Sequence, residues 1–196
     1  MFSKIEKIFL VIVIVVIAGC AGKDFVRPDS GALKNGQTTY NQVVQQFGKP
    51  YAEGTLQKND KLVKTISYAY ASVGGKSHKG GTPARAMGFH FFDNILVGYD
   101  FVSSFAEDNT DFNEMKLNQI TEGKTTLDEA IQILGEPSGY YIYPLIESNS
   151  EEAVAYSYSE TKGSVFNMKM FRKILVITYG GDRVVTKVEY MSSGTN

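Results

Sequence analysis

The chain has 196 residues, of which 43% are apolar and 21% are charged, a composition typical of folded globular domains rather than of disordered or fibrous chains. Its 20 Lys and Arg against 21 Asp and Glu give a formal net charge of -1, so we expect no electrostatic surface for nucleic acid. One cysteine and two histidines exclude a disulfide framework and the common Cys/His zinc sites. We therefore expect neither a metal nor another cofactor.

The N-terminus has the pattern of an export signal. Lys4 and Lys7 precede an apolar run, residues 8–18, which is shorter than the roughly 20 residues that span a bilayer as a helix. One interpretation is a general secretory signal, but the sequence Ile-Ala-Gly directly before Cys20 resembles the bacterial lipobox. That resemblance implies cleavage before Cys20 and lipid attachment to its thiol, and Ala21 after it implies sorting to the periplasmic face of the outer membrane.

The rest of the chain contains an internal repeat. Residues 36–50 (GQTTYNQVVQQFGKP) and residues 123–137 (GKTTLDEAIQILGEP) are identical at six of 15 positions without a gap. In each copy a threonine and a Gln or Glu three residues later form the pattern of a capping box, at Thr39 and at Thr126. Apolar residues then recur at helical spacing, and a Gly-x-Pro sequence ends the pattern. Each copy predicts a helix of about two turns, too short to be stable without packing on a sheet.

Strands are expected after each helix. Residues 66–70 and 154–158 alternate between large and small side chains, and in each half two further apolar segments flank a tight turn. A weaker helical pattern over residues 112–120 precedes the second capping box, and residues 30–33 are its suggested counterpart. The sequence predicts an α+β fold of two tandem helix-helix-strand-strand-strand units, each a three-stranded antiparallel sheet with short helices on one face.

Domain boundaries follow from composition. We expect a signal peptide at residues 1–19, a lipidated cysteine and tether at residues 20–29, a first unit at residues 30–106 and a second unit at residues 107–196. The two units meet at the polar stretch near residues 104–110, and the Pro-, Gly- and polar-rich composition of residues 23–37 is typical of a tether.

The repeated motif resembles a known family. A Gly-x-Thr segment that ends in an apolar residue and Gly-x-Pro, followed by three antiparallel strands, is similar to the SmpA/OmlA (BamE-like) family of outer-membrane lipoproteins. Two such units in tandem also look like β-lactamase inhibitory protein, in which paired units form one concave sheet that grips a partner. These resemblances imply a non-catalytic protein-binding module in outer-membrane assembly, envelope integrity or inhibition of an envelope protein partner.

Residue patterns for catalysis are missing from the sequence. The segment Gly75-Lys76-Ser77 lacks the preceding glycine of a phosphate-binding loop, since that position is Tyr70. His78 and His90 have no spaced partner for a metal site or a catalytic triad, and no Gly-x-Ser-x-Gly elbow occurs. We therefore expect no enzyme; the alternative is a small-ligand or lipid carrier, or an envelope enzyme with a site built across the two units.

Tyrosines and a basic loop are the candidate partner-binding residues. Alternation places large rings on one face of two equivalent strands, and this face is either core or an exposed binding surface. The Gly-rich loop that follows the first of these strands is expected to be flexible and basic, with its cations forming a charged rim. The candidates are Tyr68, Tyr70, Tyr156, Tyr158, Lys76, Lys79 and Arg85.

Overall fold

The computed structural model describes residues 23–29, 31–163, 167 and 169–194. The helices are α2 (Tyr40–Phe47), the 3-10 helix η1 (Glu114–Gln119) and α3 (Leu127–Leu134). The strands are β1 (Ala52–Lys58), β2 (Lys61–Ala71), β3 (Ala84–Phe92), β4 (Ile95–Ser103), β5 (Gly139–Ile142), β6 (Glu152–Lys162), β7 (Lys169–Tyr179) and β8 (Val185–Gly194). Within these residues, none of the helices is both long and apolar enough to cross a membrane.

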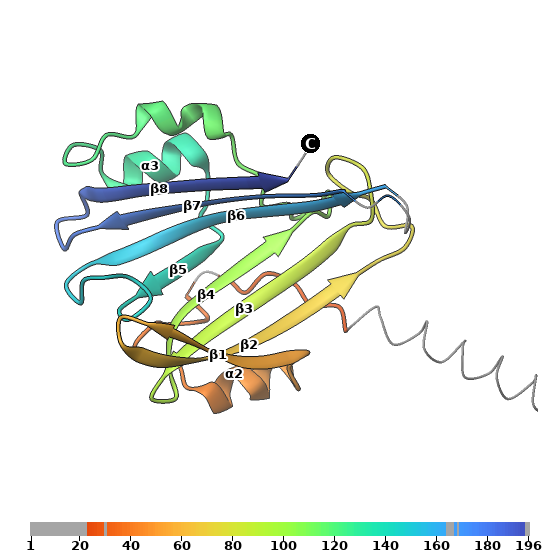
Figure 1. Ribbon diagram of the computed structural model, residues 1–196, viewed down its shortest axis with the longest axis horizontal. Helices are drawn as coiled ribbons and strands as arrows, with labels where there is room; N and C mark the ends of the chain where they lie inside the picture. The colour runs from red at the N-terminus through yellow and green to blue at the C-terminus, as the bar shows by residue number, and fades with distance from the viewer. Residues whose placement is uncertain (1–22, 30, 164–166, 168, 195–196) are drawn as a thin grey trace, which may run out of the picture.

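All eight strands form one antiparallel sheet in which each strand pairs with its neighbour in sequence, in the order β1 to β8 (Figure 1). The expectation of an α+β protein built from two separate three-stranded sheets is therefore wrong: the described part of the chain is mostly β, with three short helices. The short strand β5 joins the two halves, because Tyr140 pairs with Tyr99 of β4 on one side and with Val154 of β6 on the other.

Two strands gave no signal in the sequence. Strand β1 has the sequence AEGTLQK, and all but one of its residues are exposed, so it shows no apolar alternation. Strand β5 has only four residues, which is too few for a period of two to stand out. Without these two strands the sequence pattern divides into two units, whereas hydrogen bonding makes the sheet continuous.

The two helices and their caps are confirmed. Thr39 accepts a hydrogen bond from the backbone N–H of Gln42, and Thr126 accepts one from that of Glu129, with the reciprocal side-chain bonds present in both capping boxes. The expected third helical segment is η1, whereas residues 31–33 form a turn rather than a helix.

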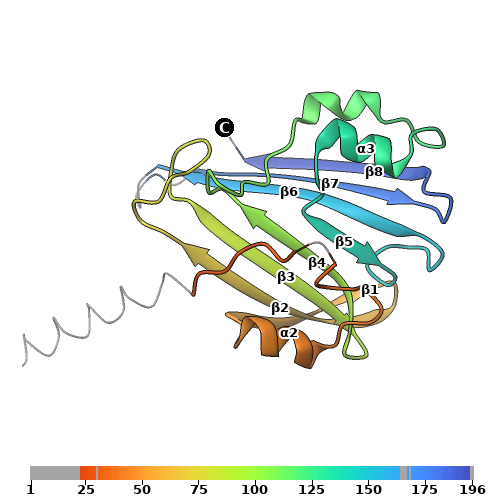
Figure 2. The ribbon, with the colours of Figure 1, turned by 180° about the vertical axis from the view of Figure 1, so that it is seen from behind.

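Both helices cover the same face of the sheet. Val43 of α2 belongs to one core cluster with Phe89, and Ala130 of α3 belongs to a second cluster with Val154. One row of paired residues runs across both clusters on this face: Phe89, Tyr99, Tyr140, Val154 and Ile177. In Figures 1 and 2 the helices accordingly lie on the outer side of the curved sheet, at its two ends. We call this the helix face.

Residues 24–29 and 31–37 also pack on the helix face and do not form a free tether. The ring of Phe25 lies edge-on to Tyr68 and to Phe101, with 6.4 Å between the ring centroids in both pairs. The backbone N–H of Gly36 donates to the carbonyl of Leu96 at 2.8 Å. The tether expected over residues 23–37 is therefore wrong for the described part of this segment, because Leu33 belongs to the first core cluster and Phe25 packs against it. Its backbone runs across the sheet on this face (Figure 2).

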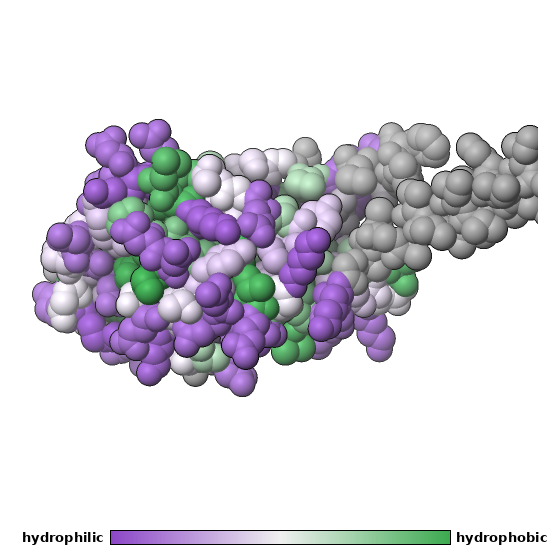
Figure 3. All heavy atoms as spheres, turned by 90° about the horizontal axis from the view of Figure 1, so that it is seen from below, coloured by the Kyte–Doolittle hydropathy of each residue, from purple (hydrophilic) through white to green (hydrophobic). Residues whose placement is uncertain are grey.

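The opposite face of the sheet is concave. Along a flat sheet, β1 and β8 would lie about 34 Å apart, given about 4.8 Å between neighbouring strands. Leu56 of β1 and Thr186 of β8 nevertheless line the same hollow. The sheet therefore curls away from the helices. By contrast, the surface that carries α2 and β1 is mainly hydrophilic, with hydrophobic side chains scattered over it (Figure 3).

Candidate functional site

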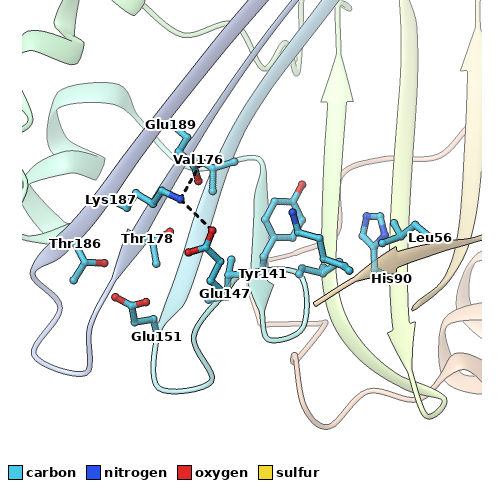
Figure 4. A pocket seen from close by; sticks show the side chains of 13 residues that line it. Leu56, His90, Tyr141, Glu147, Glu151, Val176, Thr178, Thr186, Lys187 and Glu189 are labelled. Atoms are coloured by element: carbon cyan, nitrogen blue, oxygen red, sulfur yellow. Dashed lines mark ion pairs between the residues drawn. The ribbon is translucent and has the colours of Figure 1, made fainter. Parts of the chain in front are cut away.

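A groove of about 510 Å³ lies at one end of the concave face (Figure 4). Its residues come from both halves of the chain, and we call this set the groove: Leu56, Lys58, His90, Tyr141, Leu145, Ile146, Glu147, Glu151, Val176, Thr178, Thr186, Lys187 and Glu189. One cross-strand row supplies His90, Tyr141, Thr178 and Lys187. The groove thus exists only because strands far apart in sequence share one curled sheet.

The connection between β5 and β6 forms part of the groove wall. Asn59, in the turn between β1 and β2, donates from its side-chain amide to the carbonyls of Pro144 at 3.0 Å and Ile146 at 2.7 Å. Leu145 lies over Gly98 of β4, where a Cβ atom would approach its Cδ1 atom to 2.4 Å. A glycine inside a strand often marks such a close approach. The turn at one end of the sheet therefore holds the wall of the groove in place.

Charged side chains surround the opening. Lys187 forms ion pairs with Glu189 at 3.1 Å and with Glu147 at 3.6 Å, which joins β8 to the wall of the groove. The hydrogen bond with Glu189 and the charges of both glutamates raise the pKa of Lys187 above its usual value. Lys58 is exposed on the opposite side, on β1. The rim therefore offers both signs of charge, while Leu145, Ile146 and Val176 supply apolar surface inside.

His90, Asp100 and Tyr141 form a polar group on this face. The Nε2 atom of His90 lies 3.5 Å from the Oδ1 atom of Asp100, and its ring lies 6.2 Å from that of Tyr141 between centroids. Gly88 and Gly139 flank Asp100 in the register, and a Cβ at either would come within 3.1 Å of an Asp100 atom, so glycine leaves room for the carboxylate.

Tyr141 contributes a hydroxyl to this group and His90 a buried ring nitrogen. Burial, and then the nearby charge of Asp100, raise the pKa of Tyr141 well above its usual value, so its hydroxyl stays protonated. The Nδ1 atom of His90 is buried and has no hydrogen-bond partner among the described residues. Buried polar atoms in proteins are usually hydrogen-bonded, so this atom is available to a bound group. Within the described part of the chain, no group of three potential ligands could hold a metal ion.

Three of the four predicted tyrosines are core residues. Tyr68 is 7% exposed, Tyr156 is 2% exposed and Tyr158 is fully buried. Tyr68 donates its hydroxyl to the carbonyl of Gly48 at 2.8 Å, and Tyr156 donates to that of Gly135 at 2.9 Å, so both rings pack beneath the C-termini of the helices. The interpretation of these three rings as an exposed surface is therefore wrong. The helices cover Tyr68 and Tyr156, while His78, Lys79 and Lys173 lie against Tyr158. Tyr70 is half-buried and stacks on Phe105.

Two of the three cations predicted to form a charged rim make ion pairs within the protein instead. Arg85 is 6% exposed and contacts the carboxylates of Asp24 at 2.7 Å, Glu107 at 2.8 Å and Asp108 at 2.8 Å. Lys79 pairs with Asp111 at 2.7 Å. Arg85 therefore holds the N-terminal segment to the sheet instead of facing a partner.

Backbone hydrogen bonds join the loop that carries these lysines to the segment after β4. Lys76 is exposed, but its backbone carbonyl accepts a hydrogen bond from the N–H of Ala106 at 2.9 Å. The N–H of His78 donates to the carbonyl of Ser104 at the same distance. None of these cations lines the groove, and Cys20 lies outside the described residues.

Sequence reasoning missed the groove altogether. Its residues are spread over five strands and the connection between β5 and β6, and no local motif connects them. Two signals were present: glycines inside β3 and β4, at Gly88 and Gly98, and a histidine on a strand. Neither shows which face of the sheet is open, because that depends on where the helices pack.

Comparisons with known proteins place this chain in no established family. No family model matches the chain, and no curated protein matches it. A solved structure from Streptococcus mutans, provisionally named a beta-lactamase inhibitor protein, is similar over 93% of this chain and 96% of its own, with 14% sequence identity and a TM-score of 0.41.

Proposed function

We propose that the protein is an exported lipoprotein that binds another envelope protein in the groove and does not itself catalyse a reaction. In this proposal Cys20 carries the lipid and the folded domain lies at the periplasmic face of the outer membrane. The observation that supports the binding role is the concave face of the sheet, free of the described helices, with a groove built from both halves of the chain.

The lining of the groove suits a loop or extended segment of a protein. Protein interfaces combine an apolar centre with a polar rim that remains in contact with water. The apolar centre of the groove consists of Leu145, Ile146 and Val176. Its polar rim includes the exposed side chains of Lys58 and Glu147. His90 and Tyr141 add hydrogen-bonding groups for the partner's polar atoms.

Site-specific photo-cross-linking in intact cells tests this proposal. A benzoylphenylalanine at Thr186, which is exposed and lines the groove, is expected to give one discrete adduct with a partner protein. The matched control is the same residue at Gln45, which is exposed on α2. Adducts of equal yield at both positions, or none at Thr186, would contradict binding in the groove.

Mutation of the groove supplies the second half of the test. Tyr141→Phe removes only a hydroxyl and is expected to weaken the adduct at Thr186, while Tyr51→Phe, at a ring 77% exposed and outside the groove, leaves it unchanged. Both variants must keep the wild-type melting temperature within a few degrees for the comparison to hold.

A small-ligand carrier is the second candidate. The volume of about 510 Å³ lies in the range of small-molecule sites, and the buried Nδ1 atom of His90 is a ready partner for a ligand donor. Native mass spectrometry of protein purified from its own envelope distinguishes the two. A stoichiometric small molecule, lost in His90→Phe, favours the carrier.

A further inference from the structure

The position at which the N-terminal segment joins the folded domain decides which end of the molecule faces the membrane. Asp24 is fixed by its ion pair with the buried Arg85, and Phe25 is packed against the core. Cys20 precedes Asp24 by only four residues. An extended chain spans at most about 3.6 Å per residue, so Cys20 lies within about 14 Å of Asp24.

Arg85 marks one particular end of the sheet. It pairs with Tyr70 of β2 and with Ser103 of β4, close to where these strands end. The loop between β2 and β3, the last residue of β6 and the first residue of β7 lie at this same end, where the described chain begins (Figure 1). We call it the anchor end. The groove lies toward the other end: its residue His90 follows Arg85 by five residues on β3, about 17 Å at about 3.3 Å per residue.

The loop at the anchor end, residues 72–83, presents an apolar and a basic side chain to solvent. Val73 is 99% exposed, and Lys76 is exposed and forms no ion pair with the described residues. The carboxylates nearby are already engaged, Asp24, Glu107 and Asp108 with Arg85 and Asp111 with Lys79 and Lys173. The backbone hydrogen bonds of Lys76 and His78 hold the loop in this position.

We propose that the anchor end lies directly against the lipid surface, with Val73 at the level of the headgroups and Lys76 contacting lipid phosphates, so that the groove lies toward the end of the sheet that is remote from the membrane. This inference rests on the proposed lipid attachment at Cys20. The occupant is a membrane surface because a lipid held within about 14 Å of Asp24 leaves no room for another protein between this end and the bilayer. Juxtamembrane lysines favour anionic lipid, which fits the single cation at the tip of the loop.

The lone cysteine of the chain allows a direct test with the full lipidated protein. Because the thiol of Cys20 carries the lipid, a second cysteine is a unique labelling site. Val73→Cys at the anchor end and Leu62→Cys near the groove end, where the native side chain is 71% exposed, form a matched pair of exposed apolar positions flanking β2. Each variant is labelled with an environment-sensitive fluorophore and reconstituted in vesicles of phosphatidylethanolamine and phosphatidylglycerol.

Spin-labelled lipids are expected to quench the fluorophore at position 73 and not that at position 62, while aqueous iodide shows the reverse order. Lys76→Gln is expected to lower by about fivefold the ratio of molecules whose anchor end contacts the membrane to molecules whose anchor end does not. The control Lys58→Gln at the groove end is expected to leave this ratio unchanged.

Mass spectrometry of the same samples distinguishes a failure of the proposed orientation from a failure of the lipoprotein assignment. If Cys20 is acylated and both labels respond equally to the two quenchers, the proposed orientation is overturned while the lipoprotein assignment stands. If Cys20 carries no acyl chain, the lipoprotein assignment fails and the orientation fails with it.

Discussion

At the scale of single residues, the helix face contains a buried cation that its neighbours hold in charged form. Lys173 is 2% exposed, yet it forms ion pairs with Asp111 at 2.8 Å and Glu114 at 2.6 Å and donates to the carbonyl of Phe112. Lys79 supplies a second cation to Asp111. The cluster joins β7 to the segment that leads into the second helix, because a buried charge must be paired or it is strongly destabilising.

Removing this cation should destabilise the fold. Lys173→Met keeps the length of the side chain but leaves two carboxylates without their main partner, and we expect it to lower the free energy of unfolding by about 3–5 kcal/mol. The control Lys187→Met removes an exposed ion pair and should cost less than about 1 kcal/mol. Urea denaturation followed by circular dichroism measures both values; equal effects would show that burial does not matter here.

The same cluster predicts how stability depends on pH. Burial disfavours the charged form of Asp111, but hydrogen bonds from Lys173 and Lys79 outweigh it and lower its pKa below 3.8; Lys173 likewise lowers the pKa of Glu114 below 4.5. The stability that these groups contribute is present above about pH 4.5 and is lost as pH falls through their lowered values. Between pH 5 and pH 3 the stability of Lys173→Met should therefore fall less than that of the wild type, as measured by melting temperature across that range.

The hydroxyls of Tyr68 and Tyr156 should contribute equally to the stability of the two halves of the sheet. Tyr68→Phe and Tyr156→Phe each delete one hydrogen bond to the carbonyl of a helix-terminating glycine and should each cost about 1 kcal/mol. Tyr51→Phe, at a ring 77% exposed, is the control and should have no effect on stability. A large loss in only one of the two core variants would contradict their structural equivalence.

At the scale of elements, the ends of the two helices follow from backbone conformation. Gly48 has a φ of 83° and Gly135 a φ of 90°, values that side-chain-bearing residues adopt only with strain. No heavy atom lies within 4 Å of a Cβ built at either position, so the cost of a substitution comes from the backbone alone.

Substitution of these glycines tests the strain without a steric clash. Gly48→Ala and Gly135→Ala are each expected to lower the free energy of unfolding by about 1–3 kcal/mol. Gly181→Ala, in a turn with an ordinary φ and open space around the new methyl group, is the matched control and should be neutral. Chemical denaturation measures all three; a neutral result at Gly48 and Gly135 would contradict the conformation of the helix ends.

At the scale of the whole molecule, the continuous sheet predicts cooperative unfolding. Strand β5 pairs with both β4 and β6, and Tyr140 packs against both core clusters. The chain has no tryptophan, so Phe47→Trp on α2 and Leu134→Trp on α3 each report on one half. Their fluorescence transitions in urea are expected to coincide with each other and with the loss of circular dichroism. Two separate midpoints would show that the halves unfold independently.

Local signals in the sequence were enough to locate the helices. Thr39, Thr126 and the glycines that follow each helix act through contacts within a few residues, so their positions can be inferred without a fold. The same holds for the longer strands, which alternate over many residues. It does not hold for β1 and β5, since one is exposed and the other is very short, and their pairing depends on neighbours distant in sequence.

The sequence by itself determined the repeated pattern of caps, the large and small faces of the strands and the expectation of a lipid anchor at Cys20. Only the tertiary structure decided that the eight strands form one sheet, that Tyr68, Tyr156 and Tyr158 are core and that Arg85 binds the N-terminal segment. The reason is physical: alternation shows that a strand has two different faces, but which face is buried depends on where helices and distant strands pack. The groove lies on the face opposite the helices, so its residues can be identified only from the curled sheet.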